Sequence, residues 1–289
     1  MNRLRHYPGY LAYRIFSGLF GLLPEPAMRK TGEVLGIVAF YLAPGRRRIA
    51  EANMRRVVGP DGPLRRLTRQ LFASYGRYWA ETFWVRPRRL DEMMSHTSVE
   101  GMEHIRELRK HGGVILALPH LGNWEAAGLQ GAADNLDLVA AAEALPNPLI
   151  SRWFIDQRAL FGIDVVLVEK GASTRLLSLL QSGRTLALPS DRDLSGRGVA
   201  VKFFEEETTF PAGPFVLSKR TGARVVPVAT YFRETGRGHE FVVRPPLREG
   251  TIEDMAQELA GHFEDFIRAR PTQWHVLQPL WPSDRTDRS

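Results

Sequence analysis

From about residue 98 onward, short apolar runs alternate with longer amphipathic segments, and this alternation constrains the fold more than any other feature. The runs are almost continuously aliphatic, which is typical of strands buried on both faces of a sheet. Several intervening segments, such as NPLISRWFIDQRALFG and ASTRLLSLLQSG, have helical spacing. We therefore predict an α/β fold: a central, twisted, mixed and mostly parallel sheet flanked by helices, whose last strands are partly antiparallel. The predicted strands are VILAL (114–118), LDLVAAA (136–142), VVLV (165–168), TLALP (185–189), VAVKFF (199–204), RVVPVATYF (224–232) and EFVVRP (240–245).

Residues 9 to about 84 have the periodicity of helices, interrupted by prolines and glycines near residues 24, 44 and 60. We therefore predict a single domain over residues 1–289. It would comprise a basic helical part, residues 1–90, and an α/β catalytic core, residues 98–282.

The positive charge of the chain is concentrated near its N-terminus. Residues 1–110 hold 20 Lys and Arg against 10 Asp and Glu, a balance of +10, and because the whole chain carries +7 the rest carries −3. Such an asymmetry indicates a polyanionic partner, which is either a nucleic acid or an anionic membrane surface.

The segment YLAYRIFSGLFGLLPEP is the most apolar part of the N-terminal third, but Arg14 interrupts it and Pro24 ends it. It is too short to predict a membrane span, and it lacks the small-residue cleavage site of a signal peptide. Two interpretations are equally open. The segment forms a helix lying in the surface of a membrane, or it forms a buried hairpin with the next apolar run, GEVLGIVAFYLAP.

The turn after the strand VILAL carries more functional groups than a turn needs, since LALPHLGNWEAAG contains His120, Asn123, Trp124 and Glu125. Functional sites of α/β sheets gather at the carboxyl ends of strands, and NWEAAGLQGAA is predicted to begin a helix there. A histidine with a carboxylate partner has the fixed tautomer that a general base requires. However, H-x4-E spacing is common by chance, and a histidine after a strand is more often a hydrogen-bonded loop residue.

The stretch HLGNWE resembles the H-x4-D/E motif of the lysophospholipid and lipid A late acyltransferase family, and is most similar to that of its actinobacterial phosphatidylinositol mannoside acyltransferases. Three further blocks match in order: ALPSDRDLSGRGVAVKFF, TTFPAGPFVLSKRTGARVVPV and PTQWHVLQPLW. The resemblance runs from about Tyr75 to Trp281, which makes it far more specific than the spacing alone. Glu125 stands where many members have Asp, so its longer arm changes how the carboxylate reaches His120.

The resemblance implies transfer of a fatty acyl group from acyl-CoA, with palmitoyl-CoA expected, to a sugar hydroxyl of a phosphatidylinositol mannoside. In this reaction His120 is the general base and Glu125 orients its ring. The chain has no cysteine and no G-x-S-x-G elbow, so we expect direct transfer without an acyl-enzyme. No cofactor or metal is expected. A lipid A precursor or another lysolipid as acceptor, and acyl carrier protein as donor, remain open.

Asp191 and Arg192 follow the strand TLALP much as His120 follows LALP, so both turns are expected at one rim of the sheet. The resemblance implies that Asp191 assists His120 or contacts the acceptor, and that Arg192 faces the thioester oxygen or a phosphate. The alternative is a turn with an internal Asp–Arg ion pair.

The remaining expected substrate contacts surround this rim. The resemblance implies that Glu143 and Arg158 shape the acceptor pocket, although a surface ion pair is an equal alternative. Pro211 and Gly213 enter a helix whose start is expected either to hold a phosphate or to be only a capped loop. Possible linings of an acyl channel, which are equally plausible as core, are Trp124, Phe154, Phe161 and Phe215.

Trp274 and His275 are expected to pack and hydrogen-bond in the core, and the other histidines are assigned no chemistry. The leading interpretation is thus a peripheral enzyme at the cytoplasmic face of the plasma membrane. A protein that binds nucleic acid through the Arg-rich helices is the alternative, but it leaves His120 and Glu125 without a purpose.

Overall fold

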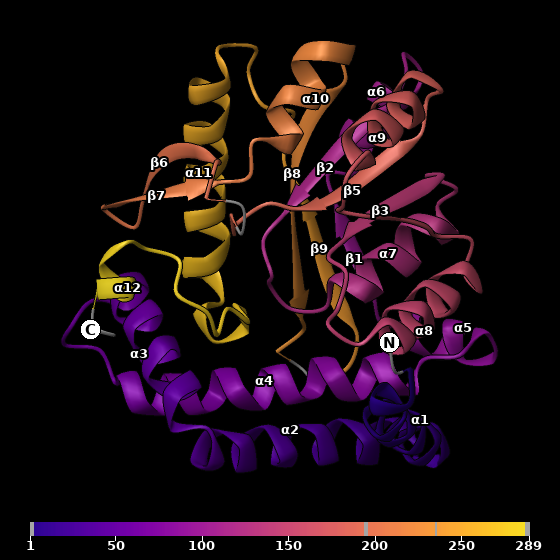
Figure 1. The fold of residues 1–289 in the computed structure, drawn as a ribbon, viewed down its shortest axis with the longest axis vertical. Helices are drawn as coiled ribbons and strands as arrows, with labels where there is room; N and C mark the ends of the chain where they lie inside the picture. Colours follow the sequence, from indigo (N-terminus) through magenta and orange to yellow (C-terminus); the bar gives the residue numbers. More distant parts are fainter. Residues whose placement is uncertain (1–2, 194–195, 235, 287–289) are drawn as a thin grey trace.

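A mixed, mostly parallel sheet forms the centre of the protein, as predicted, in a computed structural model that describes residues 3–193, 196–234 and 236–286 (Figure 1). Within these residues the main sheet has seven strands in the order β1-β9-β8-β2-β5-β3-β4, and β6 and β7 form a separate antiparallel pair. The five strands β8, β2, β5, β3 and β4 run parallel to one another, whereas β9 is antiparallel to β8 and parallel to β1. The strands are β1 (Ser98–Glu100), β2 (Val114–Leu118), β3 (Leu138–Ala142), β4 (Asp164–Leu167), β5 (Thr185–Pro189), β6 (Val199–Phe203), β7 (Glu206–Phe210), β8 (Arg224–Phe232) and β9 (His239–Val243).

Helices cover both faces of this sheet and one end of it (Figure 1). The longer helices are α1 (Tyr7–Leu22), α2 (Glu25–Leu42), α3 (Pro44–Val58), α4 (Leu64–Trp84), α6 (Met102–Arg109), α7 (Trp124–Ala133), α8 (Pro148–Ala159), α9 (Ala172–Gln181), α10 (Gly213–Thr221) and α11 (Ile252–Ala269). The short ones are η1 (Arg3–His6), η2 (Pro87–Arg89), α5 (Leu90–Met94), η3 (Pro271–Gln273) and α12 (Ser283–Thr286).

The central strands are apolar throughout because both faces of the sheet are buried. All five residues of β2 are buried, and they alternate between two cores. Leu116 packs in the core formed with α6, α7 and α8, and Ile115 packs in the core formed with α9, α10 and α11. This is the two-faced burial that the continuous apolar runs predicted.

The sequence analysis missed β1 and β7 and placed β6 in the main sheet. β1 has only three residues, and β7 reads EETTF, with no apolar run to reveal it. β6 alternates buried and exposed residues, which is the pattern of a strand with one solvated face. It pairs with β7 and packs on α11 rather than joining the sheet.

α4 crosses one end of the sheet, and α2 lies directly against it (Figure 1). The two helices approach so closely because glycines face each other. A Cβ atom at Gly36 would overlap the carbonyl oxygen of Phe72, and one at Gly76 would overlap that of Gly32. α2 is therefore held against α4 by direct backbone contact.

α1 and α2 expose apolar side chains along their outer sides. Of the fifteen exposed large hydrophobic residues in the described part of the chain, eleven lie on these two helices. The interpretation of a buried hairpin is therefore wrong, because both helices pack on α4 and leave these residues outside. No helix in the described ranges has the length and hydropathy that crossing a membrane requires. The eleven residues are Tyr7, Leu11, Ile15, Phe16, Leu19, Leu22, Val34, Leu35, Val38, Tyr41 and Leu42.

Candidate active site

The register of two parallel strands brings His120 and Asp191 together. Leu118 of β2 lies opposite Pro189 of β5, and each chain continues for two residues to reach the functional side chain. His120 Nδ1 lies 2.6 Å from Asp191 Oδ1, and the backbone N–H of His120 donates to Asp191 Oδ2 at 3.0 Å. The two turns that follow LALP and TLALP therefore do meet at one rim.

Asp191 is completely buried and receives three hydrogen bonds. Besides the two from His120, the indole Nε1–H of Trp274 donates to Oδ2 at 2.9 Å. Burial opposes ionisation, but the His120 ring and these hydrogen bonds outweigh it and hold the pKa of the Asp191 carboxyl below its usual value. The ionised carboxylate therefore accepts the Nδ1–H of His120 and fixes the tautomer in which Nε2 is the basic nitrogen.

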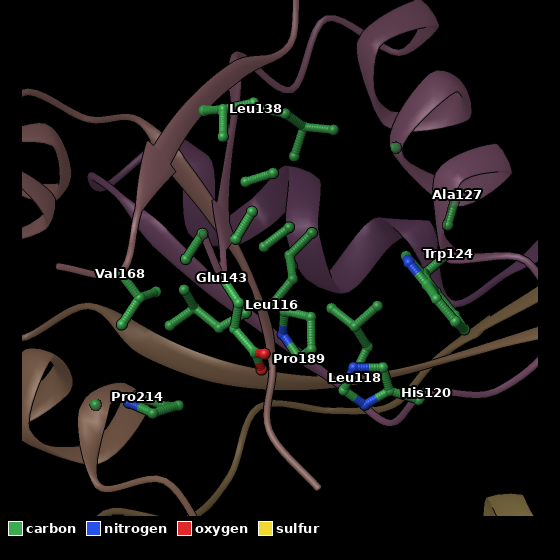
Figure 2. Close-up of a pocket in the computed structure, with 18 of the residues that line it drawn as sticks. Leu116, Leu118, His120, Trp124, Ala127, Leu138, Glu143, Val168, Pro189 and Pro214 are labelled. Atoms are coloured by element: carbon green, nitrogen blue, oxygen red, sulfur yellow. The ribbon is translucent and has the colours of Figure 1, made fainter. Parts of the chain in front are cut away.

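The His120 ring lies at the wall of a cavity of about 1310 Å³. Figure 2 shows the ring beside Leu118, with Leu116 and Leu138 farther along the cavity wall. Small-molecule sites usually measure about 300–1,000 Å³, so this cavity has room for more than one substrate group. Its apolar lining comes from both faces of the sheet. Ile105 lies on the α7 side, and Leu176 lies on the α9 side.

The expectation that Glu125 orients the His120 ring is wrong in this structure. Glu125 lies in the first turn of α7, as predicted, but its carboxylate makes a two-pronged ion pair with Arg158 of α8, at 2.5 and 3.0 Å. Burial disfavours the charge of Arg158, yet Glu125 raises the pKa of this guanidinium above its usual value. The carboxylate that holds His120 is instead Asp191, which the sequence analysis had offered as an assistant. Both members of the Glu125–Arg158 pair line the cavity.

A second ion pair also lines the cavity. Arg192 donates to Glu143 at 2.7 Å and also to the side-chain oxygen of Gln278. Asp191 and Arg192 therefore do not pair with each other, since Asp191 contacts His120 and Trp274 whereas Arg192 contacts Glu143 and Gln278. Among the described residues, Arg192 Nε is buried without a hydrogen-bond partner.

The other predicted contacts divide between the cavity and the core. Trp124, Phe154, Pro211 and Gly213 line the cavity. Neither Phe215 nor Phe161 is part of the lining, since Phe215 is fully buried in the core on the α9 side of the sheet and Phe161 packs against the core on the other side.

Asn123 was expected to contact substrate, and this expectation is wrong. Its side chain has no exposed surface, and its Oδ1 accepts the N–H of Ala126, which caps α7. The short polar side chain before an apolar helix is the N-cap signal that could have identified this role.

A C-terminal strap, residues 271–276, holds the His120 turn from the other side. The N–H of His275 donates to the carbonyl of His120 at 2.8 Å, and the N–H of Gly122 donates to that of Gln273 at 2.9 Å. Gly122 has φ +59°, and a Cβ atom there would overlap the carbonyl of Thr230, so only glycine fits. The strap thus positions both the His120 turn and the Trp274 indole.

Sequence reasoning missed the contribution of α4, since Tyr75, Tyr78 and Trp79 line the cavity and place this helix over the site. It also missed that His275 lines the cavity. Burial, and secondarily the nearby His120, lower the pKa of His275 to about 3. Its Nε2 lies 2.8 Å from Ser74 Oγ. No local signal in the sequence of α4 indicates that these aromatic residues cover a site.

Comparison with known proteins identifies the family of the chain. The family described as bacterial lipid A biosynthesis acyltransferase matches residues 2–283. The chain is 35% identical over 246 residues to the phosphatidylinositol mannoside acyltransferase of Mycobacterium tuberculosis H37Rv, which covers 81% of this chain and 77% of that protein. Identity to the enzyme of the same name from Mycolicibacterium smegmatis is 34% over 245 residues, 81% of this chain and 79% of that one.

A more distant relative is the lipid A biosynthesis lauroyltransferase of Escherichia coli K12, which is 25% identical over 239 residues, 80% of this chain and 76% of that protein. These matches confirm the family predicted from HLGNWE and the blocks that follow it. The chain belongs to the bacterial lipid A biosynthesis acyltransferase family.

Proposed function

We propose that this acyltransferase transfers a fatty acyl group from acyl-CoA, with palmitoyl-CoA as the expected donor, to a sugar hydroxyl of a phosphatidylinositol mannoside. The observation that carries the proposal is the His120–Asp191 pair at the wall of a large, mostly apolar cavity. The names of the two mycobacterial relatives support the acceptor class.

In the proposed reaction His120 Nε2 takes the proton of the acceptor hydroxyl as its oxygen attacks the thioester carbonyl carbon. Asp191 stabilises the imidazolium that forms. The tetrahedral intermediate then collapses, the C–S bond breaks, and the imidazolium returns its proton to the departing thiolate. Every proton and electron pair is thereby accounted for without a covalent acyl-enzyme.

Positive charge near the carbonyl would stabilise the oxyanion of the intermediate. Arg192 is the proposed source, because its unpartnered Nε lies in the buried part of a side chain that lines the cavity. A general base contributes about 10²–10⁴-fold, so this stabilisation and the positioning of the two substrates must supply the rest of the rate enhancement.

The two kinds of cavity wall suit the two substrates. The aliphatic wall formed by Leu116, Leu138 and Ile105 would take the acyl tail, whose burial is favourable by about 0.8 kcal/mol per methylene. The polar wall formed by Glu125 and Arg158 would contact hydroxyl groups of the acceptor. Glu143 would contact these hydroxyl groups as well.

The exposed apolar faces of α1 and α2 would rest in the lipid surface, which would place this enzyme peripherally at the cytoplasmic face of the plasma membrane. Exposed arginines on the neighbouring helices would meet anionic headgroups, each worth about 1 kcal/mol near such a surface. These side chains are Arg46, Arg48, Arg55, Arg65, Arg66 and Arg69.

The test is mass spectrometry of the lipids formed by the purified full chain, palmitoyl-CoA and separate vesicles holding a phosphatidylinositol mannoside, a lipid A precursor or a lysophospholipid. A mass increase of one palmitoyl group on the mannoside, which is lost in His120→Ala, is the expected result. Acylation of the lipid A precursor alone would reject the acceptor. Undiminished transfer by His120→Ala would reject the base. Activity only when acyl carrier protein replaces CoA would reject the donor.

A further inference from the structure

A buried charged network lies beneath the His120 turn, and the proposed reaction does not use it. Its centre is Glu81 of α4, which is only 3% exposed. Glu81 Oε1 accepts from Arg77 Nε at 2.8 Å, and Oε2 lies 2.8 Å from His239 Nε2 on β9. Oε2 also accepts from Asn123 Nδ2 at 2.6 Å. One carboxylate therefore ties α4 to the sheet and to the turn that begins α7.

Asn123 is the link between this network and the cavity. Its Oδ1 accepts from the N–H of Ala126 at 3.0 Å, while its Nδ2 donates to Glu81. Because each end of the amide has its own partner, the side chain cannot turn over without losing both hydrogen bonds. The next two residues along the chain, Trp124 and Glu125, line the cavity. The Asn123 side chain thus connects Glu81 to the part of the cavity wall formed by Trp124 and Glu125.

A gain in folding stability does not by itself explain why a charged network is buried here. Buried ion pairs are often no more stabilising than well-packed apolar residues, and their best-attested benefit is the selection of one arrangement. Burial by itself would raise the pKa of Glu81, but Arg77 and His239 reverse this and hold it below its usual value. An ionised Glu81 accepts hydrogen bonds at both oxygens, which fixes the direction in which the Asn123 amide must point.

We propose that Glu81 is a positioning residue for acyl transfer: through Asn123 it sets the first turn of α7, and with it the cavity-wall side chains Trp124 and Glu125. This inference rests on the proposed function, since its readout is acyl transfer. Glu81 itself does not contact the cavity. Trp124 packs edge-on against the ring of His120, the proposed base, with the ring centroids 5.3 Å apart. A shift of this turn would therefore displace His120, and misplacement of a reacting group by about 1 Å can cost about 10²-fold in rate. The effect on kcat should be large.

The sharpest test exchanges the hydrogen-bonding roles of Glu81 and Asn123. In Glu81→Gln an amide NH₂ meets one of the donors Arg77, His239 or Asn123. In Asn123→Asp two carboxylates face each other, although the helix cap is kept. Each single variant should lower kcat by about 10²-fold, with a much smaller change in KM for acyl-CoA.

The double variant Glu81→Gln/Asn123→Asp restores a complementary pair. The amide of residue 81 then donates to the carboxylate of residue 123, which still accepts the N–H of Ala126. His239 can accept the second amide hydrogen as its other tautomer, and the charge of Arg77 remains balanced. We expect this variant to recover most of the kcat that each single change removes.

Thr185→Val is the matched control. Thr185 is fully buried at the opposite end of β5 from Asp191, and its Oγ1 accepts from Arg109 at 2.6 Å. This variant should lower the melting temperature, as the loss of any buried hydrogen bond does, and leave kcat unchanged. Wild-type kcat in folded Glu81→Gln and Asn123→Asp would overturn the proposal. So would a folded double variant that recovers no activity.

Asn123→Ser covers the case in which the single variants do not fold. Serine keeps the helix cap but loses the hydrogen bond to Glu81, whose other two partners remain. A reduced kcat in this folded variant supports the proposal, and a wild-type kcat overturns it. If the wild-type chain transfers no acyl group to any acceptor, the proposed function has failed, and this outcome is distinct from a Glu81 variant that is as active as the wild type.

Discussion

The Nδ1 atom of His120 is hydrogen-bonded to Asp191, whereas Glu125, the carboxylate of the H-x4-E motif, forms an ion pair with Arg158. Asp191→Asn should therefore lower kcat by about 10²–10⁴-fold, because the imidazolium loses its counter-charge and the ring loses its fixed tautomer. Glu125→Gln should act mainly on KM for the acceptor, because it changes the polar wall of the cavity. Steady-state kinetics with both substrates varied will separate the two. Equal losses of kcat in both variants would contradict this division of roles.

The sequence predicted which residues lie near His120, but not which carboxylate contacts its ring. The sequence placed His120 and Asp191 at one rim because each follows an apolar strand. It could not indicate which carboxylate contacts Nδ1, since that depends on Leu118 lying opposite Pro189 and on Arg158 reaching Glu125. The partner of each side chain depends on the register of β2 with β5 and on the position of α8. The spacing of residues along the sequence does not indicate either.

His275 should make the stability of the fold depend on pH. Its pKa is about 3 in the folded protein against about 6.5 when unfolded, so between these values the unfolded chain binds the additional proton. The contribution is fully present above pH 6.5 and is lost as the pH falls towards 3, with a slope of up to about 1.4 kcal/mol per pH unit.

Urea unfolding at pH 7, 6, 5 and 4 will measure this dependence. His275→Gln, which retains a polar group near Ser74, should lose less stability over that interval than the wild type does. Parallel curves for the two proteins would show that another group is responsible.

The contact of α2 with α4 depends on Gly36. Gly36→Leu would drive a side chain into the backbone at Phe72, and overpacking of this kind costs about 1–3 kcal/mol or more. We expect a lower melting temperature and a displaced α2. Gly261→Ala, in α11, is the control, because a Cβ atom there meets no neighbour within 4 Å and should be neutral or stabilising by up to about 1 kcal/mol. A Gly36→Leu protein as stable as the wild type would mean that α2 does not need this close approach.

The elements themselves were largely predictable where burial leaves a periodic signal. The apolar strands of the main sheet and the amphipathic helices α8 and α9 are of this kind. β7 was missed because EETTF is polar. β6 was wrongly placed in the main sheet because the sequence of a strand does not indicate which strand it pairs with. The exposed face of α2 was likewise unpredictable. An apolar helix has the sequence pattern of a core helix whether its outer face is covered by protein or exposed.

In the N-terminal third of the chain, the exposed apolar residues lie on α1 and α2, and exposed arginines lie on the neighbouring helices α3 and α4. Basic charge alone would suit a nucleic acid as well as a membrane. The apolar face of α1 and α2 favours the membrane, because a phosphate backbone offers nothing to bury it. α4 packs on both helices and also lines the cavity, so a lipid surface at α1 and α2 would lie against a helix that lines the proposed acceptor pocket.

The double variant Leu35→Asp/Val38→Asp tests this arrangement, since both side chains are 45% exposed on α2. Burying one large apolar side chain contributes roughly 1.5–3 kcal/mol, so losing two should lower partitioning onto anionic vesicles by at least about tenfold. Leu160→Asp is the matched control, because Leu160 is exposed but follows α8 rather than lying on α1 or α2. Co-sedimentation with phosphatidylinositol vesicles, alongside a DNA mobility-shift assay, gives the readout. Undiminished sedimentation of the double variant would reject α2 as a lipid-binding face, and tight, salt-sensitive DNA binding without vesicle binding would favour the nucleic-acid interpretation.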